Sequence, residues 1–218
     1  MSEAAASAQS PMRQIVQPFL DLARAPRVLW GMNLSYLVEG FTHFGGVTYL
    51  AMYFNLYGGL GDKEAGWMVG ALTSGITLTM FFFGGMADRW GARRAIFASL
   101  ALMVLGRLLL FLAPSLGLAA GGLATPFTGV AFAGILLLVL GFGIYQPAVF
   151  AGVRRATTPE TSAMAFAMIY AVNNLGGWLP TFMSPFRTRF GIDACFAFFA
   201  GATLLGFVAL ALLLGRTK

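Results

Sequence analysis

The chain has 218 residues, of which 58% are hydrophobic and 10% are charged, and its mean hydropathy is +0.78. These values exclude an ordinary soluble domain of this length, because soluble domains carry far more charge. The formal net charge of +6 is compatible with nucleic-acid binding, but in a membrane protein the position of each charge matters more than the sum. We therefore expect lipid to be the main solvent and predict no nucleic-acid partner.

The first residues do not predict a cleaved signal. Residues 1–10 are small and polar and lack an apolar core, so the first membrane span is expected to direct insertion. Residues 11–26 mix apolar side chains with Arg13, Asp21 and Arg24, which predicts a short helix on the cytoplasmic surface. We assign residues 1–27 to a cytoplasmic tail.

Long apolar stretches then follow one another with short polar breaks. Each is about 20 residues or longer, the length that a helix needs to cross a bilayer. The predicted spans are residues 28–57, 64–87, 94–113, 127–153, 162–186 and 193–215. The expected fold class is therefore an all-α membrane protein, a bundle of six transmembrane helices over residues 28–215 with a short end at 216–218.

The basic residues predict the orientation of this bundle. Six spans place both termini on one side, and most basic residues outside the spans fall on that side. These residues are Arg13, Arg24, Arg27, Arg89, Arg93, Arg94, Arg154, Arg155, Arg216 and Lys218. Only Lys63, Arg187 and Arg189 fall on the other side. Both termini should be cytoplasmic, and we expect an integral protein of the bacterial inner (plasma) membrane.

Two charged side chains lie deep within predicted spans. Glu39 follows Arg27 by 12 residues and Arg107 follows Arg94 by 13, which places them about 18 and 20 Å deep at the helical rise. A buried charge is costly unless it is paired, so we predict that Glu39 and Arg107 pair near the middle of the membrane. The pair either fixes the packing of the helices or takes part in function.

Other polar side chains lie at similar depths. Tyr36 and His43 share a helical face with Glu39, and a carboxylate beside an imidazole can pass protons. The alternative for His43 is a hydrogen-bonded structural role. Further candidates for a substrate or proton pathway occur on the fourth and fifth spans, namely Gln146, Tyr170, Asn173 and Asn174. Inter-helix hydrogen bonds without a ligand would also account for them.

The sequence does not point to catalysis. His43 and Cys195 are the only residues of their types, so they cannot by themselves form a metal cage or an internal disulfide. We also find no nucleotide-binding loop and no convincing pair of nucleophile and base. We therefore predict no metal, no cofactor and no catalytic residue, and we expect that the chain is not an enzyme.

The loop at residues 84–94, with sequence GGMADRWGARR, carries the strongest local motif. Asp88 is expected to accept hydrogen bonds from the free amides that begin the third span, and Gly91 permits a sharp turn. The spacing resembles the signature loop of the major facilitator superfamily, although Ala92 stands where a basic residue is usual. By that resemblance the loop latches two six-helix halves, and its gating residues would be Gly84, Asp88, Arg89, Gly91, Arg93 and Arg94.

Three further stretches, residues 39–45, 141–147 and 166–176, resemble signatures of the proton-dependent oligopeptide transporter branch. The resemblance implies alternating access and symport of a small, peptide-like solute with protons. Tyr36 and Gly40 replace an acidic and a basic member of the first signature, and Gln146 replaces the usual Lys before Pro147. These departures imply either a diverged substrate or altered coupling.

Transporters of this superfamily have twelve or more spans, with the substrate held between two halves. The six predicted spans look like the amino-terminal half. We therefore expect partners besides the lipid bilayer and a small-molecule substrate: a second six-helix half, a second copy in a homodimer, or other membrane subunits. The remaining alternatives are a fragment of a longer protein and a non-transporting transmembrane subunit of a larger complex.

Overall fold

The structure, a computed structural model, describes residues 26–214, and it contains no β-strand in that range. The long helices of this range are α2 (Arg27–Gly58), α3 (Asp62–Phe83), α5 (Ala92–Leu112), α6 (Pro126–Arg155), α7 (Pro159–Trp178) and α9 (Ile192–Leu214). The short ones are α4 (Met86–Trp90), α8 (Ser184–Phe190) and the 3₁₀ helices η1 (Ala113–Leu116) and η2 (Leu179–Met183). The helix predicted within residues 11–26 and the end at 216–218 fall outside the described residues, apart from Pro26.

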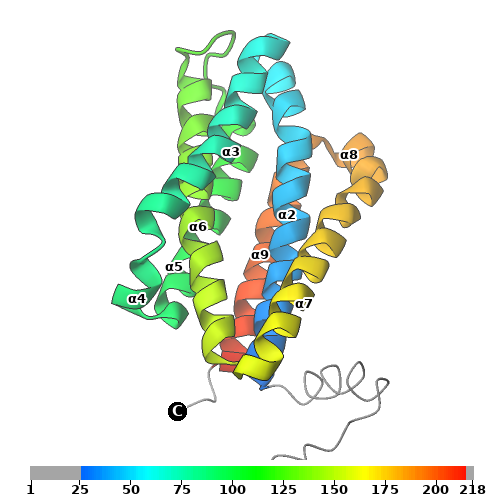
Figure 1. The fold of residues 1–218 in the computed structure, drawn as a ribbon. Helices are drawn as coiled ribbons and strands as arrows, with labels where there is room; N and C mark the ends of the chain where they lie inside the picture. The colour runs from blue at the N-terminus through cyan, green and yellow to red at the C-terminus, as the bar shows by residue number, and fades with distance from the viewer. Residues whose placement is uncertain (1–25, 215–218) are drawn as a thin grey trace, which may run out of the picture.

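The long helices run side by side along one axis (Figure 1). Helix α2 packs against α7 and α9, while α5 packs against α6 and α9, and α3 packs against α6. The first and last described residues lie at the same end of this bundle. The connections between α2 and α3 and between α5 and α6 lie at the opposite end.

Two of the helix starts follow directly from local sequence chemistry. Thr125 precedes α6 and its side-chain oxygen accepts a hydrogen bond of 3.3 Å from the amide of Thr128, with Pro126 at the first helical position. Thr158 and Thr161 form a reciprocal capping box at the start of α7. Such caps satisfy amide donors that have no partner inside the helix.

The outside of the bundle is apolar. Phe81, Leu205 and Leu212 are 84%, 73% and 71% exposed, which is costly in water and favourable in lipid. Four helices of the described part are long and apolar enough to cross a membrane, namely α3, α5 with the η1 that follows it, α6 and α9. The other two long helices are α2, which carries the buried polar residues Asn33, Ser35, Glu39 and Thr42, and α7, which has no fully buried polar side chain.

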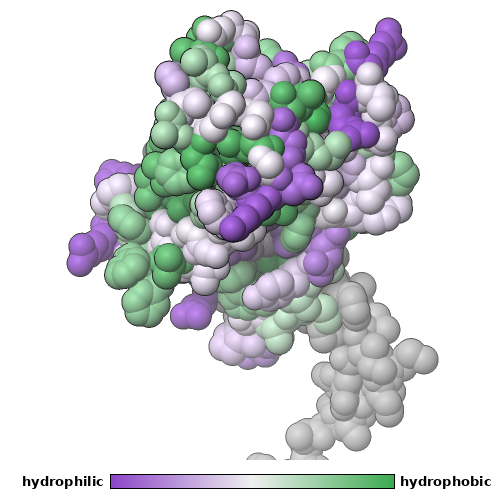
Figure 2. All heavy atoms as spheres, turned by 90° about the horizontal axis from the view of Figure 1, so that it is seen from above, coloured by the Kyte–Doolittle hydropathy of each residue, from purple (hydrophilic) through white to green (hydrophobic). Residues whose placement is uncertain are grey.

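Apart from Glu39 and Arg107, the charged residues of the described helices lie near the two ends. Arginines gather toward the end where the described chain begins and finishes, at Arg27, Arg89, Arg93, Arg94, Arg154 and Arg155. Seen from the opposite end, hydrophilic side chains form separate patches between apolar ones (Figure 2). The basic residues of that opposite end are Lys63, Arg187 and Arg189.

The predicted fifth span differs from the observed helix. A continuous helix over residues 162–186 is wrong, because α7 ends at Trp178 and the chain continues as η2 and α8. Pro180 and Pro185 lack the amide hydrogen that a continuing helix needs, and their rings clash with the preceding turn. The second span likewise ends at Phe83 rather than 87, before the Gly84–Gly85 pair.

Glycines permit a close contact between α5 and α6. A methyl group added at Gly106 would lie 2.7 Å from the carbonyl oxygen of Gly134, and one added at Gly134 would lie 2.9 Å from the carbonyl oxygen of Gly106. Both obstacles are backbone atoms and cannot rotate away. The two helices can therefore approach this closely only with glycine at both positions.

We predict that Gly106→Ala lowers the free energy of unfolding by about 1–3 kcal/mol, the usual cost of overpacking. The measurement is unfolding in mild detergent, followed by tryptophan fluorescence. Gly201→Ala on α9 is the matched control, since a methyl group there meets nothing within 4 Å. Equal unfolding midpoints for the two variants would contradict the predicted contact.

Candidate functional site

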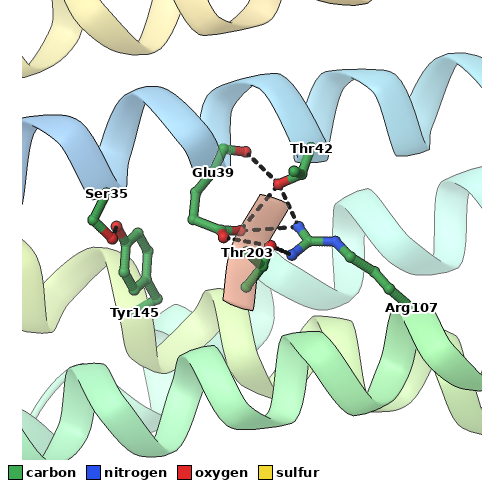
Figure 3. Close-up of polar contacts among 6 residues, drawn as sticks. All are labelled: Ser35, Glu39, Thr42, Arg107, Tyr145 and Thr203. Atoms are coloured by element: carbon green, nitrogen blue, oxygen red, sulfur yellow. Dashed lines mark hydrogen bonds and ion pairs between the residues drawn. The ribbon is translucent and has the colours of Figure 1, made fainter. Parts of the chain in front are cut away.

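A buried ion pair lies in the middle of the bundle (Figure 3). Arg107 Nη2 on α5 lies 2.9 Å from Glu39 Oε2 on α2, and both side chains are only 2–3% exposed. The pairing predicted from the depths of these two residues is confirmed. Because each charge alone would be costly at this position, the pair ties α2 to α5.

Two threonines complete the hydrogen bonding of this pair. Thr203 on α9 donates to Glu39 Oε1 at 2.7 Å and accepts from Arg107 Nη1. Thr42 accepts from Arg107 Nη2 at 2.7 Å and lies 3.2 Å from Glu39 Oε2. Both carboxylate oxygens are therefore satisfied, which offsets the cost of burying the charges. We call Glu39, Thr42, Arg107 and Thr203 the central network.

Sequence reasoning missed Thr203. It is the only hydroxyl-bearing residue of α9, which is apolar apart from Asp193 in its first turn. That isolation was the available signal, since a hydroxyl inside lipid needs a partner. The signal does not say which helix supplies the partner, so the third member of the network depends on the packing of α9 against α2 and α5.

A cavity of about 100 Å³ lies beside the central network, and we call it the polar cavity. Four helices line it: α2, α3, α6 and α7. Its lining residues are Tyr36, Glu39, His43, Phe44, Ile76, Phe142, Tyr145, Gln146 and Asn173. The predicted shared face of Tyr36, Glu39 and His43 is confirmed, and Gln146 and Asn173 meet it from two other helices.

Hydrogen bonds hold the wall of the polar cavity that α6 provides. Gln146 Nε2 donates to Tyr36 Oη at 3.1 Å, and Ser35 Oγ shares a 2.7 Å hydrogen bond with Tyr145 Oη. The rings of Tyr36 and Tyr145 stack with centroids 5.8 Å apart. These contacts fix the side chains of α2 and α6 against each other at the level of the cavity.

His43 separates the polar cavity from a second, much smaller one. The smaller cavity measures about 10 Å³, enough for about one water molecule, and Arg107 and Thr42 line it. The imidazole of His43 borders both cavities and packs against the ring of Phe142, with ring centroids 4.6 Å apart. His43 and Phe142 thus form the partition between the guanidinium group and the polar cavity.

Three of the predicted pathway residues do not line the polar cavity: Arg107, which lines the smaller one, and Tyr170 and Asn174. Tyr170 is 54% exposed and its ring packs against Phe150, with centroids 5.9 Å apart. Asn174 is also exposed, whereas its neighbour Asn173 faces the cavity. Successive residues of a helix differ by about 100° in direction, so α7 directs only one of the two asparagines toward the cavity.

The loop at residues 84–94 forms the short helix α4 between Gly84–Gly85 and Gly91. Gly91 has φ +81°, a conformation that favours glycine, and α5 begins directly after it. The prediction that Asp88 caps α5 is wrong, because α5 has no side-chain cap. Asp88 instead lies 3.7 Å from Arg155 at the end of α6, with both side chains largely exposed. The predicted gating residues therefore include one link between α4 and α6.

Solved structures share this fold. One is described as a POT family transporter in complex with 5-aminolevulinic acid, with TM-score 0.75, 21% identity, and coverage of 88% of this chain and 38% of its own. Another is a bacterial homologue of the human drug peptide transporters PepT1 and PepT2, with TM-score 0.74, 20% identity, and coverage of 86% and 42%. A third, peptide transporter POT in complex with sulfate, has TM-score 0.72, 23% identity, and coverage of 86% and 37%.

The chain therefore spans less than half the length of these three proteins. No curated protein matches it significantly in sequence. A family model, described as Major Facilitator Superfamily, matches residues 29–218, which is most of the chain. That match confirms the resemblance predicted from the loop at residues 84–94. This membrane protein belongs to the Major Facilitator Superfamily.

Proposed function

We propose that the chain is one six-helix half of a small-solute transporter that works by alternating access and couples uptake to protons. The observation that carries the proposal is the position of Glu39, which belongs to the central network and also lines the polar cavity. An ionisable group buried inside a membrane bundle and bordering a cavity is typical of substrate and proton pathways. Peptide-like solutes are the first class to test, because the structural neighbours named above are peptide transporters.

In this proposal all six long helices cross the membrane. Helices α2 and α7 have 32 and 20 residues, or about 48 and 30 Å at the helical rise, against a hydrocarbon thickness of about 30 Å. Both contribute polar side chains to the polar cavity, among them Glu39 on α2 and Asn173 on α7. The arginine-rich end is cytoplasmic by the positive-inside rule, in the inner membrane of a bacterium.

A second six-helix bundle closes the polar cavity in this proposal. It is the rest of a longer chain, a separate protein or a second copy. In this superfamily the solute lies between two such bundles. Determining the mass of the detergent-purified protein, with identification of any partner that co-purifies, distinguishes these sources.

The central network suggests how protons would be coupled. A proton on Glu39 removes the negative charge that attracts Arg107. A protonated carboxylate oxygen is also a poorer acceptor for the hydrogen bonds that both oxygens now receive, such as the one from Thr203. Protonation therefore weakens the connection between α2, α5 and α9 at one point. A solute in the polar cavity borders the same carboxylate, so its binding and the proton are energetically linked.

We predict that Glu39→Gln abolishes solute-dependent proton entry, because an amide cannot release a proton. The assay uses sealed vesicles that contain the protein with any co-purifying partner and an internal pH dye. A mixed pool of dipeptides and amino acid amides is added outside. Glu160→Gln, at an exposed carboxylate on the first turn of α7, is the control and should behave like the unchanged protein. Undiminished proton entry with Glu39→Gln would remove the coupling hypothesis.

A second candidate function is that of a non-transporting subunit. The hydrogen bonding of the central network favours this second function, because both carboxylate oxygens of Glu39 already have partners inside the protein and need no ligand. In that case the pair serves only to hold helices together, and a neutral pair of similar size would serve as well.

We predict that Arg107→Gln alone lowers the free energy of unfolding by about 3–5 kcal/mol, because Glu39 is left buried and unpaired. The double variant Glu39→Gln with Arg107→Gln should recover most of that loss. Unfolding in detergent measures the stability, and vesicle assays measure transport. If the unchanged protein transports and the stable double variant does not, the transporter is supported. If neither transports and the double variant is stable, the non-transporting subunit is supported. Full activity of the double variant would leave the ion pair a purely structural role.

The pair between Asp88 and Arg155 is the proposed gating contact. Exposed pairs at 3.7 Å add little to stability, so we predict that Asp88→Asn changes the free energy of unfolding by less than about 1 kcal/mol. Solute uptake into vesicles should nevertheless fall. Asp62→Asn, at the opposite end of the bundle, is the matched control and should leave uptake unchanged. A parallel loss in both variants would argue against a specific gate.

A further inference from the structure

We infer that the polar cavity selects solutes without a free carboxylate: neutral amides or organic cations, rather than anions or zwitterions held by their acid group. The inference rests on the proposed transport function and narrows the class of solute. It is argued from the charges that border the cavity and from the neutral donors and acceptors that remain available there.

Among residues 26–214, the only charged side chain that lines the polar cavity is Glu39, which is negative. Arg107, the only arginine or lysine in the middle of the described helices, lines the small cavity instead, behind His43 and Phe142. Its two terminal nitrogens are engaged by Glu39, Thr42 and Thr203. A solute in the polar cavity therefore meets the acidic side of the central network and not the basic side, which disfavours a carboxylate.

The packing of α2 against α7 leaves no room for a basic side chain at position 40, which is next to Glu39 on α2. A methyl group added at Gly40 would lie 2.6 Å from the carbonyl oxygen of Asn173 and 2.9 Å from its Oδ1. A methyl group added at Gly177 would lie 2.7 Å from the ring of Phe44. A basic side chain at position 40 would thus displace α7, and the close contact leaves the amide of Asn173 at the cavity wall.

The remaining polar groups of the cavity are neutral and suit an amide. Asn173 and Gln146 each carry both a donor and an acceptor, and Tyr36 adds a hydroxyl. Phe44, Phe142 and Tyr145 supply aromatic faces, which attract organic cations such as a protonated amine. The cavity volume of about 100 Å³ matches a solute, or part of a solute, the size of a single amino acid amide.

Three small probes that differ in charge test the inference. Alaninamide is a cation, N-acetylalaninamide is neutral and N-acetylalanine is an anion; the last two differ only in amide against carboxylate. Each is added at the same series of concentrations to the purified protein, with any co-purifying partner, in lipid nanodiscs. The shift of the unfolding midpoint with concentration gives the apparent Kd. We expect N-acetylalanine to bind at least about tenfold more weakly than N-acetylalaninamide.

One variant should reverse the order of affinity of the cationic and anionic probes. Gln146→Lys places a cation in the wall of the polar cavity, so N-acetylalanine should gain affinity and alaninamide should lose it. Gln146→Met is the matched control, similar in size but uncharged, and it should weaken all three probes without reversing their order. Unfolding midpoints of both variants without a probe show whether they are folded.

Equal or tighter binding of the anion by the unchanged protein would overturn the inference, and so would the absence of a shift with all three probes. Its failure is distinguishable from failure of the proposed function. Vesicles that transport carboxylate-bearing solutes in preference to neutral or cationic ones would refute the inferred solute class but not the proposed transport function. Vesicles that transport nothing from a mixed pool, with a correctly folded protein, would refute transport itself.

Discussion

The burial of one positive and one negative charge in the middle of an apolar bundle is the constraint on which this structure depends. Neither Glu39 nor Arg107 is stable there alone, and their attraction offsets the desolvation cost only with good geometry and satisfied hydrogen bonds. Thr42 and Thr203 supply those bonds. The position of α9 against α2 and α5 is therefore set by polar chemistry as well as by apolar packing, which in lipid provides little preference of its own.

Glycine determines how closely the other helices approach this centre. Gly106 and Gly134 bring α5 against α6, and Gly40 and Gly176 bring α2 against α7. A side chain at any of these positions would meet backbone atoms of the neighbouring helix. The polar cavity keeps its small volume because its walls on α6 and α7 cannot move outward without losing these contacts. The glycine contacts between helices thus also determine the size of the polar cavity.

The sequence predicted the long helices and the central ion pair because both follow from one-dimensional rules. Apolar length marks a span, and distance from a basic helix end gives the depth of Glu39 and Arg107. Direction around a helix was harder to predict. Tyr170 and Asn174 share a helix with Asn173, yet only Asn173 reaches the cavity, because helix rotation is set by neighbours. The partner of Thr203 and the exposed pair of Asp88 with Arg155 likewise depend on contacts between helices distant in sequence.

The spacing of the central network along the chain bears on how the protein is made. Glu39 pairs with a residue 68 positions later and accepts a hydrogen bond from another 164 positions later. When α2 leaves the ribosome, both of these partners are still unsynthesised. Burial of this carboxylate in lipid before those partners exist would leave it unpaired, which costs several kcal/mol. Full pairing of a side chain on α2 therefore requires residues of α5 and α9, which are synthesised later.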